Sequence, residues 1–138
     1  MTQIGQPWRL LVVDDVPENR DLLVRRLRRQ GHENVATAAD GIEAMAAIRS
    51  AVAEAAPFDT VLLDVMMPRM SGVEVLEALR ADPALSATPV IMISAATELD
   101  TVVRCIELGA EDYLPKPFNA VLLRARLGTV LEKKRLRE

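Results

Sequence analysis

Short apolar runs alternate along this chain with longer stretches of helical periodicity, and this alternation limits the folds that are open to it. The apolar runs cover residues 10–14, 35–37, 60–64, 90–94 and 113–114. Strands separated by helical stretches favour parallel pairing, because a parallel neighbour can be reached only by a crossover. A chain of 138 residues is long enough to bury a core of its own. We therefore predict one α/β domain with a five-stranded parallel sheet.

Five helices are predicted between and after these runs. They cover residues 17–29, 41–55, 72–81, 97–108 and 119–138. The fifth begins at Asn119, a good N-cap, and would be about 30 Å long. Its apolar stripe continues beyond the expected body of the domain through Leu123, Leu127, Val130 and Leu131. We assign residues 1–127 to the domain and 128–138 to an extension of the fifth helix. This extension is either a linker or coiled-coil start toward a partner, or a frayed end.

The composition limits the cellular compartments and the kinds of partner that are expected for this chain. The net charge of −3 argues against nucleic acid as the main partner. No stretch approaches the roughly 18 apolar residues that cross a bilayer, and the first residues lack the pattern of a signal peptide. Cys105 is the only cysteine, which favours a reducing compartment. We therefore predict a cytoplasmic protein with no membrane partner. One local exception to the acidic balance is a basic run within the last six residues, most simply a solvated helix face: Lys133, Lys134, Arg135 and Arg137. The exposed side of the first predicted helix is also basic and carries Arg25, Arg26, Arg28 and Arg29.

Acidic residues follow two of the predicted strands at the point where each strand ends. Asp14 and Asp15 end the first apolar run, and Asp64 ends the third. The carboxyl ends of parallel strands share one edge of the sheet, where open α/β sheets hold their ligands. Three carboxylates that converge there repel one another unless a cation lies among them, and Mg²⁺ is the natural choice for oxygen ligands. With one histidine, His32, and Cys105 away from this edge, a zinc or iron site is not expected.

The same edge offers the groups that phosphoryl transfer requires. A carboxylate can attack phosphorus and form an acyl phosphate, and the transfer needs positioning and charge neutralisation more than proton chemistry. Lys116 closes the last predicted strand and supplies an ammonium group. Ser94 ends the fourth strand and supplies a hydroxyl that could bond a phosphoryl oxygen. These residues predict a site that binds a divalent metal and handles phosphate.

Four sequence segments carry a resemblance to a known family: VVDD at 12–15, LLDVMMPRMSG at 62–72, VIMISA at 90–95 and DYLPKPF at 112–118. Together, and with the separations Asp64–Ser94 and Ser94–Lys116, they resemble the receiver domains of two-component response regulators, such as the chemotaxis receivers, over about residues 8 to 127. The resemblance implies a flavodoxin-like, doubly wound sheet with strand order 2-1-3-4-5 and helices on both faces. It also places the functional site at the switch point of that sheet.

The resemblance assigns a role to each residue at this edge. Asp64 is the expected phosphoacceptor. Asp15 would ligate Mg²⁺ directly, together with Asp64 and the backbone carbonyl of Met66, while Asp14 would act mainly through a bound water. Lys116 would pair with the phosphoryl group.

Further positions would transmit and time the signal. Ser94 fills the switch hydroxyl position and Tyr113 the aromatic switch position, although Tyr113 could also be a half-buried strand tyrosine. The bond from the lysine to Pro117 resembles the cis peptide of the family. Met66 and Ala96 occupy the two positions that tune the lifetime of the phosphorylated state. Neither can orient a hydrolytic water by hydrogen bonding, so we expect slow self-dephosphorylation.

The function implied is a phosphorylation-dependent signalling switch rather than a turnover enzyme. A histidine kinase or a histidine phosphotransfer protein would donate the phosphoryl group. The face formed by the fourth helix, fifth strand and fifth helix would then control a partner, a homodimer or a C-terminal output domain; the fifth helix could also pair two copies. A free-standing phosphorelay shuttle is the main alternative. A pseudo-receiver and an aspartate-nucleophile phosphatase are less favoured, the latter because Met66 replaces the required general acid.

Overall fold

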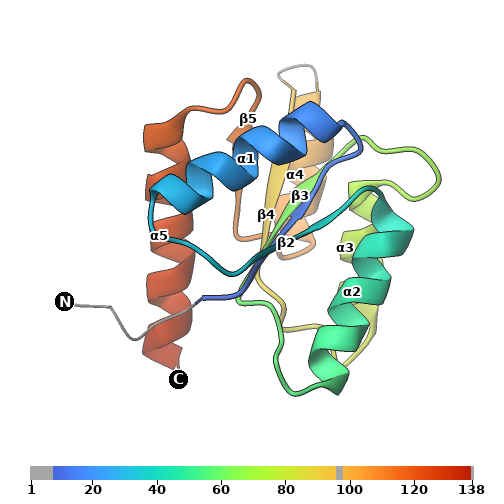
Figure 1. The fold of residues 1–138 in the computed structure, drawn as a ribbon. Coiled ribbons are helices and arrows are strands. Elements are labelled where there is room, and N and C mark those ends of the chain that lie inside the picture. Colours follow the sequence, from blue (N-terminus) through green and yellow to red (C-terminus); the bar gives the residue numbers. More distant parts are fainter. Residues whose placement is uncertain (1–7, 96–97, 138) are drawn as a thin grey trace.

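A sheet of five parallel strands lies at the centre of the computed structural model, which describes residues 8–95 and 98–137 (Figure 1). The strands are β1 (Leu10–Val13), β2 (Val35–Ala38), β3 (Thr60–Asp64), β4 (Val90–Ser94) and β5 (Asp112–Pro115). Their order across the sheet is β2-β1-β3-β4-β5, and every pair is parallel. The predicted order 2-1-3-4-5 is therefore confirmed, and the order reverses between β1 and β3.

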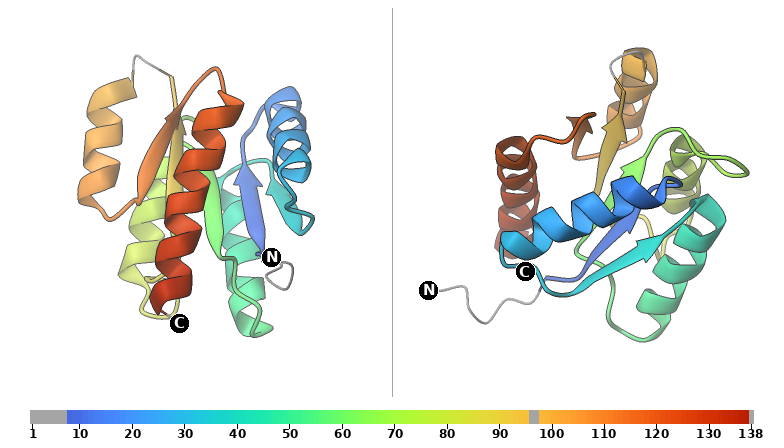
Figure 2. Two further views of the ribbon diagram at one scale, coloured as in Figure 1. Left: turned by 90° about the vertical axis from the view of Figure 1, so that its left-hand side faces the viewer. Right: turned by 45° about the horizontal axis from the view of Figure 1, so that its top comes forward.

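Five helices in the described part of the chain cover both faces of the sheet (Figure 2). They are α1 (Pro17–Arg29), α2 (Gly41–Ala53), α3 (Gly72–Ala81), α4 (Leu99–Glu107) and α5 (Ala120–Arg137). The helices α1 and α5 pack side by side on one face, while α2, α3 and α4 cover the other. The second helix ends two residues earlier than predicted, and Ala55, just beyond it, adopts a left-handed φ of 59°.

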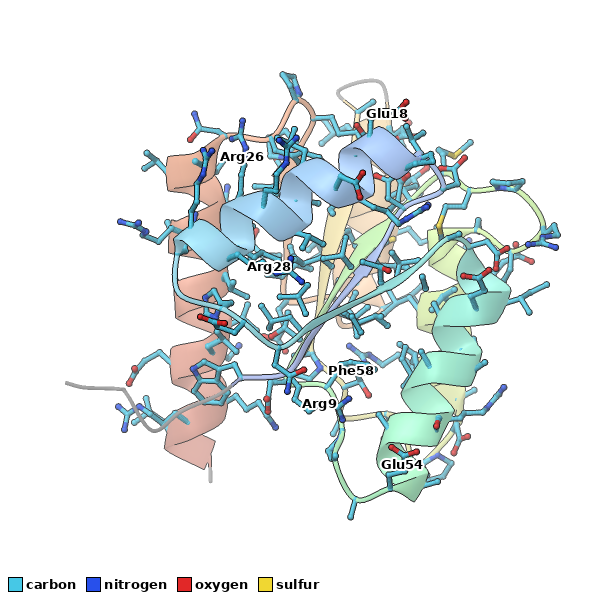
Figure 3. The ribbon with its side chains drawn as sticks, in the orientation of Figure 1. Arg9, Glu18, Arg26, Arg28, Glu54 and Phe58 are labelled. Atoms are coloured by element: carbon cyan, nitrogen blue, oxygen red, sulfur yellow. The ribbon has the colours of Figure 1, made fainter. Side chains whose placement is uncertain are left out.

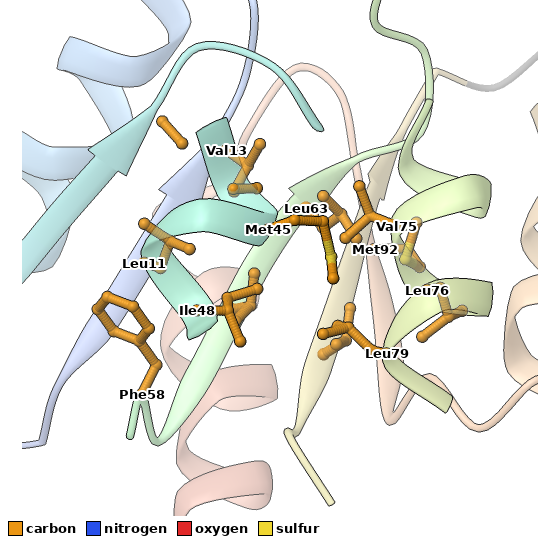
Figure 4. Packing of buried hydrophobic residues seen from close by; sticks show 14 of the residues in the cluster. Leu11, Val13, Met45, Ile48, Phe58, Leu63, Val75, Leu76, Leu79 and Met92 are labelled. Carbon is orange, nitrogen blue, oxygen red and sulfur yellow. The ribbon is translucent and has the colours of Figure 1, made fainter. Parts of the chain in front are cut away.

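The alternation of side chains along the strands divides the core into two clusters. Leu11 and Val13 of β1 point toward α2 and α3, where they join Leu63 and Met92 (Figure 4). Leu10 and the other alternate strand residues point toward α1 and α5. Every residue of β1, β3 and β4 is buried, as expected for central parallel strands that are covered on both faces.

The edge of the sheet opposite the strand carboxyl ends is held by polar contacts. The guanidinium group of Arg9 lies 4.8 Å from the centroid of the Phe58 ring (Figure 3). The backbone N–H of Arg9 donates to the Asp59 carboxylate at 2.8 Å. These contacts join the residue before β1 to the segment before β3, and they fix the relative position of the two central strands.

Helix α5 packs along the whole length of its sheet face. Val130 and Leu131 are buried, at 4% and 5% exposure, in the cluster that also contains Leu123 and Leu127. Beyond them, Lys133 lies 2.9 Å from a carboxylate oxygen of Glu111. The expectation that the apolar stripe extends past what the domain covers was therefore wrong for Val130 and Leu131. The apolar surface that α5 covers extends further than the strand positions predicted. The partly buried Trp8, ahead of β1, packs against the same cluster and adds to that surface.

Truncation of Leu131 tests whether this end of α5 belongs to the domain. Leu131→Ala removes a buried side chain, so we expect the free energy of unfolding to fall by about 2 to 3 kcal/mol. Leu136→Ala is the matched control, since Leu136 lies on the same helix and is 71% exposed. Urea unfolding followed by circular dichroism measures both. Equal and small effects would mean that the end of α5 does not contribute to the core.

Candidate functional site

The sheet topology brings the ends of four strands together at one edge. Asp14 directly follows β1, Asp64 is the last residue of β3, and Ser94 is the last residue of β4. Lys116 directly follows β5, and its backbone N–H donates to the carbonyl of Ser94 at 2.9 Å. The hydrogen-bonded register of the strands therefore determines which side chains meet here.

Three carboxylates form a cluster at this edge. One oxygen from each of Asp14, Asp15 and Asp64 lies within 4.8 Å of the others. Asp14 and Asp64 are buried and Asp15 is half-buried. One oxygen of Asp14 accepts the backbone N–H of Val16 at 2.9 Å, but Asp14 Oδ2 and Asp64 Oδ1 are buried without a hydrogen-bond partner. Buried carboxylate oxygens normally have a partner, so this oxygen-only set fits a hard divalent cation.

Lys116 provides the positive charge that partly balances this cluster. Its Nζ lies 3.2 Å from Asp64 Oδ2 and 3.6 Å from Asp14 Oδ2. Burial acts to lower the pKa of Lys116, but the charges of Asp64 and Asp14 outweigh it and raise the pKa. The ammonium group therefore remains charged at neutral pH and is directed at the oxygens of Asp64.

Burial sets the acidity of Asp64. Burial, followed by the charge of Asp14, raises the pKa of Asp64 from 3.8 to about 6, against the opposing effect of Lys116. At pH 7 the carboxylate is therefore mostly ionised, although its ionisation costs more than that of an exposed aspartate. A cation bound among the three carboxylates would remove part of that cost.

The loop after β3 is held in place by a close contact and two capped helices. A Cβ atom on Gly72 would lie 2.2 Å from the backbone oxygen of Asp64, so only glycine allows the start of α3 to approach this strand end. Ser71 and Glu74 form a capping box on α3. Arg69 forms an ion pair with Asp40, whose side chain caps α2. The loop is thus fastened to both neighbouring helices.

The predicted switch and tuning residues lie at or near the ends of β3, β4 and β5. Ser94 is 2% exposed at the end of β4. Tyr113 lies within β5, partly exposed, with the guanidinium of Arg126 at 5.8 Å from its ring centroid. Met66 points outward and is 62% exposed. The Lys116–Pro117 peptide bond is cis. Ala96 lies outside the described residues.

Sequence analysis missed one acidic neighbour of the site. The side chain of Glu98 accepts the backbone N–H of Ala95 at 2.7 Å, and its charge helps to raise the pKa of Lys116. The spacing of these two residues is that of a helix N-terminal capping contact, which could have identified Glu98 beforehand. Its carboxylate adds to the negative field around the lysine.

Comparison with known proteins agrees with the fold. Residues 10–128 match the family model of the response regulator receiver domain. The chain is 42% identical over 125 residues to the DNA-binding response regulator MtrA of Mycolicibacterium smegmatis, covering 91% of this chain and 51% of that protein. It is 44% identical over 126 residues to the transcriptional regulatory protein CpxR of Klebsiella pneumoniae, covering 91% and 50%. The chain thus spans about half the length of these relatives.

A solved structure gives the same result at the level of the fold. A putative response regulator from Chloroflexus aurantiacus superposes with a TM-score of 0.82 at 31% identity, covering 92% of this chain and 99% of that one. A doubly wound parallel sheet with its acids at the carboxyl edge places the chain among the α/β domains that hold their site at the strand ends. Within that class, the chain belongs to the receiver domains of two-component response regulators. In the part of the chain that the structure describes, no helix has the length and apolar character needed to span a membrane.

The raised pKa of Asp64 predicts a specific dependence of stability on pH. Well below pH 4 this residue is protonated in both the folded and the unfolded chain. Between about pH 4 and pH 6 the folded chain binds more protons, so the contribution of Asp64 to the free energy of unfolding falls as pH rises. We expect the stability of the wild type relative to Asp64→Asn to decrease across this window by on the order of 2 kcal/mol and then level off.

Urea unfolding of both proteins in EDTA, at a series of pH values, measures this difference directly. Groups outside the site titrate alike in the two chains and cancel in the subtraction. A difference that is flat from pH 4 to pH 7 would mean that the pKa of Asp64 is unshifted. We also expect added Mg²⁺ to stabilise the wild type more than the variant at pH 7.

Proposed function

We propose that this domain accepts a phosphoryl group from phosphohistidine onto Asp64 and acts as a phosphorylation-dependent switch. The observation that carries the proposal is the environment of Asp64. One carboxylate oxygen is buried without a partner, and the other lies 3.2 Å from the ammonium of Lys116. Asp14 and Asp15 lie close enough to Asp64 for one cation to be held by all three carboxylates. These are the groups that in-line attack on a phosphoryl group requires.

The chemistry follows from the charges. The ionised Asp64 oxygen attacks phosphorus, the P–N bond of the donor breaks, and the histidine nitrogen leaves with the electron pair of that bond. The product is an acyl phosphate on Asp64. Lys116 would face the negative phosphoryl oxygens and stabilise the charge that spreads over them. Asp14, Asp15, Asp64 and the backbone carbonyl of Met66 would hold Mg²⁺, which when bound supplies further neutralisation of these oxygens.

The output would be a change of surface on the side of α4, β5 and α5. We infer that Ser94 bonds the phosphoryl group and that Tyr113 turns inward into the space it leaves. Support for a docking surface comes from α4, where Leu99, Val103 and Ile106 are 58%, 52% and 43% exposed. Their spacing places them along one side of the helix. An exposed apolar strip of this kind favours a protein partner or a second copy of the chain.

The domain would serve as the receiver of a longer regulator with a C-terminal output domain, since MtrA and CpxR are about twice the matched length. A phosphorelay shuttle remains the alternative role. Repeated turnover of phosphate esters is not expected, because the exposed thioether of Met66 stands where a phosphatase of this chemistry needs an acid.

Replacement of the phosphoacceptor tests the assignment. With Mg²⁺ and a small-molecule phosphodonor such as acetyl phosphate, the wild type should gain one phosphoryl group, and EDTA should prevent this. Asp64→Asn should gain none, because an amide cannot form the acyl phosphate. Asp21→Asn is the matched control, since Asp21 is an exposed aspartate on α1. Intact-protein mass spectrometry measures each. Phosphorylation of Asp64→Asn at the wild-type level would refute the role of Asp64.

The lifetime of the phosphorylated state tests the role of Met66. A thioether forms no useful hydrogen bond to water, so the purified phosphoprotein should lose phosphate slowly. Met66→Asn places an amide beside the site and should accelerate hydrolysis, whereas Met66→Leu should not. Phosphate release after removal of the donor gives both rates. An unchanged rate in Met66→Asn would exclude this position as a determinant of lifetime.

A further inference from the structure

Two cavities lie between α1 and α5, on the sheet face that these helices cover. The first, of about 360 Å³, extends from Leu22 on α1 to Ala120 at the start of α5. The second, of about 350 Å³, lies farther along α5 and reaches Trp8 and Leu131. Gln30 and Arg124 line both cavities, so the two meet at these side chains. Each lies at the lower end of the roughly 300–1,000 Å³ range of small-molecule sites. We call them together the α1–α5 groove.

The first cavity is lined by four arginines that the proposed phosphorylation chemistry leaves unused. They are Arg25, Arg26, Arg29 and Arg124. Some other basic residues of this acidic chain pair with carboxylates, as Arg126 does with Asp112. Within residues 8–95 and 98–137, none of the four lies within ion-pair distance of an acid. Arg26 donates to the backbone oxygen of Phe118 at 3.0 Å, which leaves its charge unbalanced. Four guanidinium groups around one cavity repel one another, and a multiply charged anion relieves that repulsion.

Gln30 presents an unused acceptor at the junction of the cavities. Its Nε2 donates to the backbone oxygen of Ala120 at 3.1 Å, which fixes the orientation of the amide. Its Oε1 is buried and has no hydrogen-bond partner. A buried amide oxygen without a donor is uncommon, so the occupant of the groove should carry an N–H or O–H group at this point.

The second cavity has a different character. Trp8 and His32 contribute aromatic rings, and burial lowers the pKa of His32, which favours a neutral imidazole. Gly128 also lines this cavity, in the interior of α5. A Cβ atom built there meets nothing within 4 Å, so no packing contact requires glycine. Glycine inside a helix costs about 1 kcal/mol relative to alanine, and here it keeps the space beside Trp8 open.

We propose that the α1–α5 groove binds a nucleoside di- or triphosphate. The guanidinium groups of Arg25, Arg29 and Arg124 take the phosphates, which they can contact in bidentate fashion. Gln30 Oε1 accepts a hydrogen bond from the sugar or the base. The base occupies the space between Trp8, His32 and Gly128, where ring stacking favours a flat heterocycle. The groove is separate from the acidic cluster, so nucleotide binding does not depend on phosphorylation of Asp64.

Trp8 provides a direct probe, because it is the only tryptophan in the chain. ATP, GTP, tripolyphosphate and adenosine are each titrated into the 138-residue chain, with EDTA present to prevent metal-dependent binding at the acidic cluster. We expect saturable quenching of Trp8 fluorescence by a nucleoside triphosphate with one-to-one stoichiometry. Tripolyphosphate should compete without quenching, and adenosine should bind more weakly, because it lacks the phosphates.

Four variants assign this signal to the groove. Arg29→Gln and Arg124→Gln should each weaken nucleotide binding about tenfold or more. Gly128→Leu should fill the second cavity and abolish nucleotide binding while retaining tripolyphosphate, and it raises helix propensity, so the fold is retained. Arg28→Gln is the matched control, because it removes the same charge from the same helix at a residue that lines neither cavity. Figure 3 shows Arg26 and Arg28 on opposite sides of α1. Circular dichroism melting verifies the folding of each variant.

Several results would overturn the proposal. One is the absence of saturable binding by either nucleotide. Another is equal weakening by Arg28→Gln and Arg29→Gln, which would reduce the effect to general electrostatic attraction. A third is tripolyphosphate that binds as tightly as the nucleotides. Binding of poly-glutamate in place of nucleotides would instead identify the groove as a docking surface for an acidic protein.

Discussion

Two buried carboxylates, Asp14 and Asp64, lie together at the carboxyl edge of the sheet, and the site depends on keeping them there. Burial and then the charge of Asp14 raise the pKa of Asp64, because both disfavour its ionised form. The central strands, which are buried on both faces, supply the offsetting free energy through their apolar contacts. Burial of the two carboxylates therefore lowers the free energy of unfolding, and the apolar contacts of the core offset this loss. A bound cation would reduce the loss by balancing the negative charge.

Lys116 connects the two repelling carboxylates to the neighbouring strands. Its side chain faces the acids, while its backbone N–H is bonded to the Ser94 carbonyl at the end of β4. A change in charge at Asp64 therefore acts directly on the junction of β4 and β5. Tyr113 on β5 contacts Arg126 of α5, and α4, which carries the exposed apolar strip, contacts β4. Lys116 thus contacts both the acidic cluster and the end of β4.

Sequence reasoning found most of the fold, because the apolar runs and helix boundaries have local causes. The convergence of the acids followed from the placement of Asp14, Asp15 and Asp64 at strand ends, whereas the strand order came from the resemblance to receiver domains. Contacts between residues distant in sequence were harder to predict. The burial of Leu131 depends on Trp8, which is distant in sequence, and no periodicity reveals that contact.

The same distinction applies to the finer features of the sites. The pairing of Arg69 with Asp40 joins two loops and has no local signature. Glu98 had one, in its capping distance from Ala95, which sequence analysis did not use. The arginines of α1 were visible as a basic surface, but their convergence with Arg124 required the packing of α5 against α1.

Helix α5 has a mechanical consequence because it is anchored at both ends. Its first residues follow Phe118, two positions after Lys116, while Lys133 near its other end pairs with Glu111. With 18 residues it is about 27 Å long and runs from the carboxyl edge of the sheet to the opposite edge. A tilt of about 5° at the first end would displace the other by about 2 Å. Such a tilt would reach the opposite edge of the sheet only if the ion pair of Lys133 with Glu111 gave way.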